Sequence, residues 1–98
     1  MEFTLQSSDF FIEQVKQLSD NSVRIVKDKL RLLKENPFRN KRIQGHNLFL
    51  FRVRFKDSRK EKRIIYLVDK PQVKLLCILD RDKEYKDLSK YLKKLGYV

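Results

Sequence analysis

The sequence predicts a small α+β domain spanning residues 1–98, with a mainly antiparallel sheet and helices against one face of it. Two helical stripes come first, three strand-like runs follow in the second half, and a last helical stripe closes the chain. With a short strand at the start, the predicted order is strand, helix, helix, three strands, helix. A chain of 98 residues with 41% apolar content can bury one compact core and is too short for two ordinary domains.

The first half of the chain predicts a strand and a helical hairpin. Apolar residues alternate over residues 2–6, as in a short strand. Polar residues that can cap a helix precede an apolar stripe over about residues 9–19. A second helix ends at about Glu35, because Pro37 disfavours helical geometry in Asn36. The short break between the two helices predicts an antiparallel hairpin.

Residues 48–69 predict two alternating strands joined by a charged turn. One face of the first strand is apolar, and the other carries Arg52 and Arg54 towards the turn. The returning strand adds Arg63. Antiparallel pairing would gather these arginines on one rigid surface, and planar guanidinium groups match the oxygens of phosphates. The hairpin is therefore predicted to bind phosphate.

The last third of the chain predicts a buried strand and a final helix. Residues 73–79 form a nearly continuous apolar run, which is typical of a strand inside a sheet. Cys77 lies in this run without a second cysteine, so we expect a buried structural thiol. Gly96 is suited to end the last helix. The apolar stripe of that helix consists of Tyr85, Leu88, Leu92 and Leu95.

The charge balance predicts a polyanion or an acidic protein as partner. The net charge is +11, and residues 46–98 alone carry fifteen basic and seven acidic side chains, or +8. A charged fraction of 38% is also common in proteins from hot environments, which explains the abundance of charge but not the excess of cations. No long apolar run or secretory leader occurs, so we expect a cytoplasmic protein that does not span a membrane. No spacing of ligand residues indicates a metal or cofactor.

Three segments together resemble the RelE/ParE superfamily of bacterial and archaeal toxins. They are the stretch from Pro37 to Arg54, the strand Arg63–Tyr66 and the closing segment from Asp80 to Tyr85. The resemblance covers nearly the whole chain through residue types and their order, without a long diagnostic motif. It implies a toxin of a type II toxin–antitoxin pair, whose RelE-like members enter the ribosomal A site and cut messenger RNA. The implied partners are the ribosome, messenger RNA and an acidic antitoxin.

The resemblance also implies roles for individual residues. Arg52 and Arg54 match a pair of basic strand residues in RelE, and Arg63 matches its arginine on the next strand. Arg81 and Tyr85 match the basic residue after the last strand and the tyrosine near the C-terminus. Cleavage by attack of a ribose 2′-hydroxyl would then use Arg63 and Arg81 to brace the phosphate and Tyr85 to stack on a base or orient the hydroxyl. Further RNA contacts are expected from Lys56, Arg59 and Lys62.

The sequence departs from RelE at two positions. RelE has lysines where this chain has Arg52 and Arg54, and lysine can lose its proton whereas arginine effectively cannot. The proton acceptor of the reaction is therefore unassigned. The candidates are Lys56, Lys62, Asp80 and Glu84.

Other interpretations of these residues stay open. Arg52 and Arg54 could be solvated charges that discourage aggregation of an edge strand. Arg81 could pair with a neighbouring aspartate, Tyr85 could belong to the core stripe of its helix, and His46 could be a turn residue. The alternative functions are a ParE-like inhibitor of DNA gyrase and an RNA- or ribosome-binding module that has lost cleavage.

The antitoxin would need an apolar surface on which to dock. If no helix covers that face of the hairpin, its apolar residues provide exposed anchors. Burial of these residues within the monomer would rule that surface out. The predicted anchors are Leu48, Leu50, Ile65 and Leu67.

Overall fold

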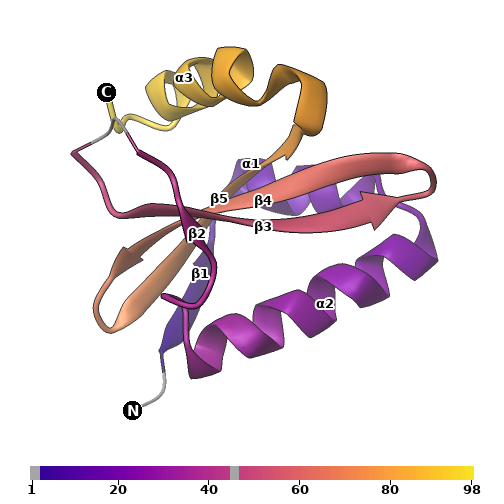
Figure 1. Ribbon diagram of the computed structural model, residues 1–98, viewed down its shortest axis with the longest axis horizontal. Helices are drawn as coiled ribbons and strands as arrows, with labels where there is room; N and C mark the ends of the chain where they lie inside the picture. Colours follow the sequence, from indigo (N-terminus) through magenta and orange to yellow (C-terminus); the bar gives the residue numbers. More distant parts are fainter. Residues whose placement is uncertain (1–2, 45–46) are drawn as a thin grey trace.

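The computed structural model describes residues 3–44 and 47–98, with the side chains of 84 and 85 excepted. Its five strands form one sheet in the order β1-β5-β4-β3-β2, in which β1 pairs parallel to β5 and the other pairs are antiparallel (Figure 1). The predicted α+β class is confirmed, and the predicted elements occur in the predicted order, with one further strand, β2, between the second helix and the three predicted strands. The elements are β1 (Thr4–Ser7), α1 (Asp9–Lys16), α2 (Asp20–Glu35), β2 (Lys41–Arg42), β3 (Leu50–Asp57), β4 (Lys60–Asp69), β5 (Gln72–Asp80), the 3₁₀ turn η1 (Arg81–Lys83) and α3 (Glu84–Lys94).

The sheet is the middle layer of three. α1 and α2 cover one face, as the hairpin prediction expects, whereas α3 crosses the opposite face (Figure 1). The expectation that all helices share one face is therefore wrong for α3. The physical reason lies in β4 and β5, whose apolar runs are buried on both faces and need a cover on each. None of the described helices is both long enough and apolar enough to cross a bilayer.

Serine side chains start the first two helices. Ser8 Oγ accepts a hydrogen bond from Phe11 N at 3.0 Å, and Ser19 Oγ accepts one from Ser22 N at 3.2 Å. α1 ends at Lys16, earlier than expected, because the next turn tightens: Gln17 N donates to the carbonyl three residues back. α2 ends at Glu35, as predicted from the proline that follows.

The sheet separates two apolar cores. The first joins Phe11 of α1 and Val26 of α2 to the facing side chains of β3, β4 and β5. The second lies under α3, where Leu88 and Leu92 pack on the other face of the sheet, and it includes Cys77. Burial raises the pKa of the Cys77 thiol to about 12, as suits the expected structural role.

Most of the residues predicted to form the antitoxin-binding surface are buried in the second core. Leu50 and Ile65 are 0% exposed and Leu67 is 6% exposed, and Leu48 packs against them half-buried. The expectation of exposed anchors is therefore wrong, because α3 occupies the face on which they lie. Alternation along a strand assigns residues to faces but does not reveal which faces a distant helix will cover.

The side chains of Ser8, the cap of α1, and of Gln14 in α1 form hydrogen bonds with the part of β5 that has no neighbouring strand on this side among the described residues. β1 pairs with β5 only as far as Leu75. Beyond that point Ser8 Oγ donates to Leu76 O at 2.7 Å, Gln14 Nε2 donates to Ile78 O at 2.8 Å, and Ile78 N donates to Gln14 Oε1 at 2.6 Å. Side chains thus satisfy backbone groups that an open strand edge would leave available for pairing with another chain.

The basic connector at residues 37–47 contains a strand that the sequence pattern did not predict. β2 is two residues long, too short for an alternating pattern to be visible, and pairs Lys41 with Arg52 and Arg42 with Phe51. The predicted features at Gly45 and His46 lie outside the described residues.

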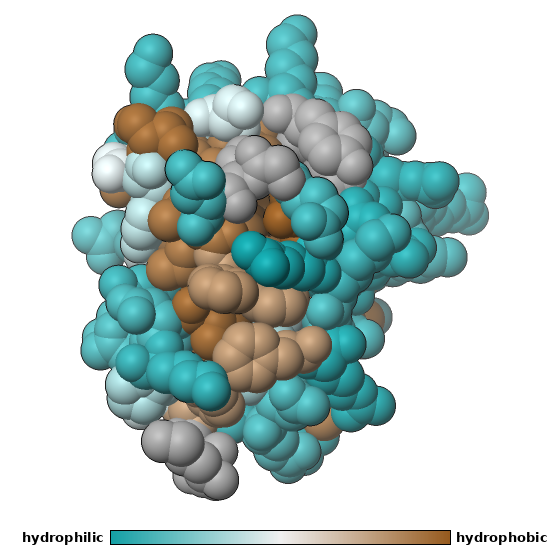
Figure 2. All heavy atoms as spheres, turned by 60° about the vertical axis from the view of Figure 1, so that its left-hand side comes forward, coloured by the Kyte–Doolittle hydropathy of each residue, from teal (hydrophilic) through white to brown (hydrophobic). Residues whose placement is uncertain are grey.

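Apolar side chains reach the surface at the end of the sheet near the β4–β5 turn. Figure 2 shows a strip of hydrophobic side chains on this side of the molecule, bordered by hydrophilic ones. Phe38 and Phe49 are exposed. The Arg42 guanidinium lies 4.4 Å from the centre of the Phe49 ring, and Lys70 Nζ lies 5.3 Å from that of Phe38. Cations therefore lie over both exposed rings.

Candidate nucleic-acid interface

The register of the sheet gathers basic side chains on one face. Arg54 of β3 lies opposite Arg63 of β4, and Arg52 lies opposite Lys41 of β2. Residues that pair across antiparallel strands project to the same face, and alternate residues of one strand share it. Arg52, Arg54 and Arg63 therefore come together, as predicted from the sequence. We call the surface made of Lys41, Arg52, Arg54, Lys56, Arg63 and Arg81 the cationic face.

The arginines of this face differ in burial. Arg54 is exposed, Arg52 is half-buried, and Arg63 is only 7% exposed. Arg63 Nη2 lies 3.8 Å from Glu61 Oε2 on the same strand. The explanation of Arg52 as an edge charge is weakened, because β2 pairs with β3 at this position; Arg54, beyond the end of β2, lies on the open edge.

Glu61 links two of the basic residues. Its Oε2 atom lies 3.4 Å from Arg81 Nε as well as 3.8 Å from Arg63 Nη2. Arg81 belongs to η1, which follows β5 directly. Its ion-pair partner is therefore Glu61 rather than either neighbouring aspartate, and Asp80 instead lies 3.1 Å from Lys62 Nζ. Glu61 is not among the residues predicted from the sequence, although its position two residues before Arg63 already assigns both to one face.

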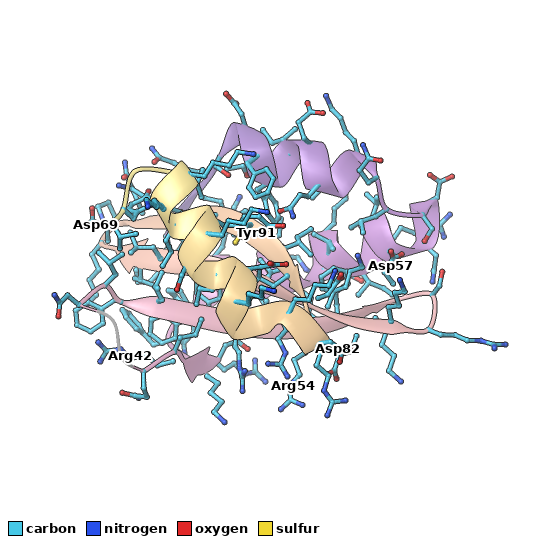
Figure 3. All side chains as sticks on the ribbon, turned by 90° about the horizontal axis from the view of Figure 1, so that it is seen from above. Arg42, Arg54, Asp57, Asp69, Asp82 and Tyr91 are labelled. Atoms are coloured by element: carbon cyan, nitrogen blue, oxygen red, sulfur yellow. The ribbon has the colours of Figure 1, made fainter. Side chains whose placement is uncertain are left out.

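A groove lies beside these residues, between the β3–β4 turn and η1. Its volume is about 540 Å³ and five of its eight lining side chains are basic. Figure 3 shows Arg42, Arg54 and Asp82 along the same border of the molecule. The predicted RNA contacts Lys56 and Arg59 both line the groove. Its lining consists of Lys56, Arg59, Lys60, Glu61, Asp80, Arg81, Asp82 and Lys83.

Lys62 does not belong to this surface. It projects to the opposite face from Arg63, where its ammonium pairs with Asp80 beside a cavity of about 210 Å³ that Gln14 and Tyr91 also line. The structure therefore does not bring Lys62 together with the arginines of the cationic face, since adjacent strand residues point to opposite faces. The side chains of Glu84 and Tyr85, a proposed proton acceptor and a proposed stacking residue, lie outside the described part of the structure.

The described side chains suit anion binding. Fixed guanidinium and ammonium groups on a rigid sheet attract phosphates, and the buried position of Arg63 limits its motion. Among the residues that the structure describes, no group of three or more His, Cys, Asp or Glu side chains could hold a metal ion.

Comparison with known proteins identifies the fold. The sequence matches no protein-family model and no curated protein. A double arginine-to-alanine variant of E. coli toxin RelE in the free state superposes with a TM-score of 0.78 at 16% identity, covering 98% of this chain and 99% of that one. The intact E. coli RelBE toxin–antitoxin complex gives 0.68 at 19% identity, covering 81% and 95%. The isolated E. coli RelE toxin gives 0.68 at 18% identity, covering 94% and 99%. The chain therefore has the fold of RelE.

Proposed function

We propose that this protein is the toxin of a type II toxin–antitoxin pair and that it cuts messenger RNA on the ribosome. The observation that carries the proposal is the convergence of Arg54, Arg63 and Arg81 on one face of a RelE fold. These three arginines occupy the positions for which the resemblance to RelE implies contact with the cleaved RNA.

The cationic face supports a phosphoryl-transfer reaction. A ribose 2′-hydroxyl attacks the adjacent phosphate, negative charge builds on the non-bridging oxygens, and the bond to the 5′-oxygen breaks. Fixed cations stabilise that charge, and cost little reorganisation when they are already in place. Arg63 is buried, whereas Arg81 is 66% exposed and can contact the phosphate. Because arginine keeps its proton, both residues act through charge and another group accepts the hydroxyl proton.

We further propose that an acidic antitoxin is the protein partner. The net charge of +11 favours an acidic protein, and in the E. coli complex a toxin of this fold is bound to its antitoxin. A toxin that acts on ribosomes works in the cytoplasm. Co-expression with a small acidic protein encoded beside this chain should yield a stable complex and suppress inhibition of translation.

A translating extract with one defined message tests the nuclease. The purified protein is added and the new 5′ ends of the message are mapped. We expect cuts at A-site codons that need ribosomes and disappear with Arg81→Ala. Arg31→Ala is the matched control: Arg31 is also an exposed, ion-paired arginine, 3.9 Å from Asp28, but belongs to α2. Cuts that persist in the Arg81 variant would contradict the assigned role of Arg81.

A binding module without cleavage is the second candidate, because arginines replace the lysines of RelE at Arg52 and Arg54. An intact message together with co-sedimentation of the protein with ribosomes would favour this candidate. If the message stays intact and the protein does not bind ribosomes, inhibition of DNA gyrase is tested with a supercoiling assay.

A further inference from the structure

Glu61 is an acidic residue in the middle of the cationic face. Its side chain is 23% exposed, and its buried Oε2 atom lies 3.4 Å from Arg81 Nε and 3.8 Å from Arg63 Nη2, as an ion-pair partner of both without a hydrogen bond to either. Its partner across the strands is Lys56, a further cation. A carboxylate at the centre of a phosphate site repels the phosphate. Glu61 must therefore have a role other than direct contact with the phosphate.

We infer that Glu61 is a positioning residue that orients Arg81 for contact with the RNA phosphate. This inference rests on the proposed function and deepens it. Nothing in the resemblance to RelE assigns a role to this position.

The geometry of Arg81 makes such a support necessary. Its side chain is 66% exposed and projects from η1, a turn of three residues. A long exposed side chain samples many rotamers and loses this freedom when it binds a ligand. Nε is the guanidinium atom that lies next to Glu61, in an ion pair without a hydrogen bond, so a phosphate would be bound through the two terminal nitrogens. Glu61 thereby reduces the conformational entropy that the Arg81 side chain loses when RNA binds.

Glu61 also connects Arg81, which lies on a turn, to strand β4 of the sheet. It belongs to β4, near the buried Arg63, whereas Arg81 belongs to the turn after β5. One carboxylate near both guanidinium groups offsets their mutual repulsion and attracts the side chain of the turn towards the sheet. The attraction of both guanidinium groups to Glu61 therefore keeps Arg81 near Arg63.

A double-mutant cycle separates positioning from stabilisation of the fold. The variants are Glu61→Gln, Arg81→Ala and both together, and multiple-turnover cleavage is measured at a series of concentrations of ribosomes with a defined A-site codon. We expect Arg81→Ala to lower kcat about 100-fold, as for loss of one charge-stabilising donor. Glu61→Gln should lower kcat about 10-fold with little change in KM, since a small misplacement already slows a reaction. In the Arg81→Ala background, Glu61→Gln should have no further effect.

The matched control is Glu13→Gln. Glu13 is an exposed carboxylate of α1 that pairs with Lys16 at 3.2 Å, away from the groove, and its replacement should leave cleavage unchanged. Losses that multiply in the double variant would overturn the inference. So would a loss that follows a lowered melting temperature, or faster cleavage in Glu61→Gln, which would make the carboxylate a competitor of the phosphate.

The inference remains testable if the protein cuts nothing. The same cycle is then measured on the affinity for a short single-stranded RNA. Coupling between the two positions in RNA affinity would keep Glu61 as the positioning residue while the nuclease proposal fails. Independent effects on RNA affinity would reject the positioning role as well.

Discussion

Arg54 and Arg63 face each other directly across the β3–β4 pair. Cβ atoms of opposed residues on one face are about 4.5–5.5 Å apart, and like charges on directly opposed residues destabilise a sheet. The opposition occurs inside the hairpin on which both cores are built. The arrangement is unfavourable for folding and favourable for binding an anion, which relieves the repulsion.

Neutralising Arg54 should therefore stabilise the fold. We expect Arg54→Gln to raise the free energy of unfolding by about 0.2–1 kcal/mol, the range of cross-strand pair energies. The gain should shrink at about 1 M salt, where exposed charges are screened within a few ångströms. Urea unfolding at low and high salt measures both effects. Arg31→Gln, which breaks an exposed pair with Asp28, is the control and should bring no gain; a destabilised Arg54 variant would contradict the prediction.

The salt dependence of RNA binding should report which face meets the RNA. Each phosphate contact with a single strand contributes about 0.7 to the slope of log K against log salt. Arg54→Gln should lower the slope by about this amount, whereas Lys62→Gln should leave it unchanged, since Lys62 lies on the opposite face. Titration of a fluorescent single-stranded RNA at several salt concentrations gives the slopes. Equal effects of the two variants would show that the cationic face is not the binding surface.

Gln14 protects the open part of β5, and its loss should both destabilise and expose that edge. Gln14→Leu leaves the N–H and the C=O of Ile78 without their side-chain partners. We expect a loss of about 1–3 kcal/mol in the free energy of unfolding, the cost of unsatisfied buried polar groups. Concentration-dependent association should appear as well. Urea unfolding and light scattering test the two parts, with the exposed Gln17→Leu as control; a monomeric variant of full stability would refute the edge-protection role.

The buried thiol of Cys77 predicts a loss of stability in base. Its pKa rises from 9.0 to about 12 on burial, so the unfolded chain releases the proton first. The stabilising effect is complete below about pH 9 and is lost as the pH rises towards 12, by up to about 1.4 kcal/mol per pH unit.

Cys77→Val removes the titrating group, together with the contribution of its charge to the raised pKa of Tyr91. The free energy of unfolding should fall less steeply with pH in the variant than in the native chain. Buried Tyr66, whose pKa is also raised to about 12, contributes equally to both proteins and cancels in the difference. Urea unfolding at a series of alkaline pH values provides the comparison, and parallel curves would be the contrary result.

Alternation and helical periodicity predicted the elements other than β2 and η1, and the gathering of Arg52, Arg54 and Arg63, because these patterns depend on the local backbone alone. The same alternation already assigned Lys62 to the other face and Glu61 to the arginine face. No local pattern shows that Glu61 contacts Arg81, twenty positions away. Nor does one show that α3 covers Leu50 and Ile65. Those features depend on tertiary packing.

The pairing of β1 with β5 has a consequence for the order of folding. Thr4 pairs with Gln72, so this contact closes a long loop, whereas β3, β4 and β5 are joined by two-residue turns. Short loops close at a smaller entropy cost, and contacts between distant residues slow folding. We therefore expect the β3–β4–β5 meander to assemble first and β1 to join late. The hairpin that carries the opposed arginines would then exist before the N-terminal strand is in place, so the repulsion between them acts from the earliest steps of folding.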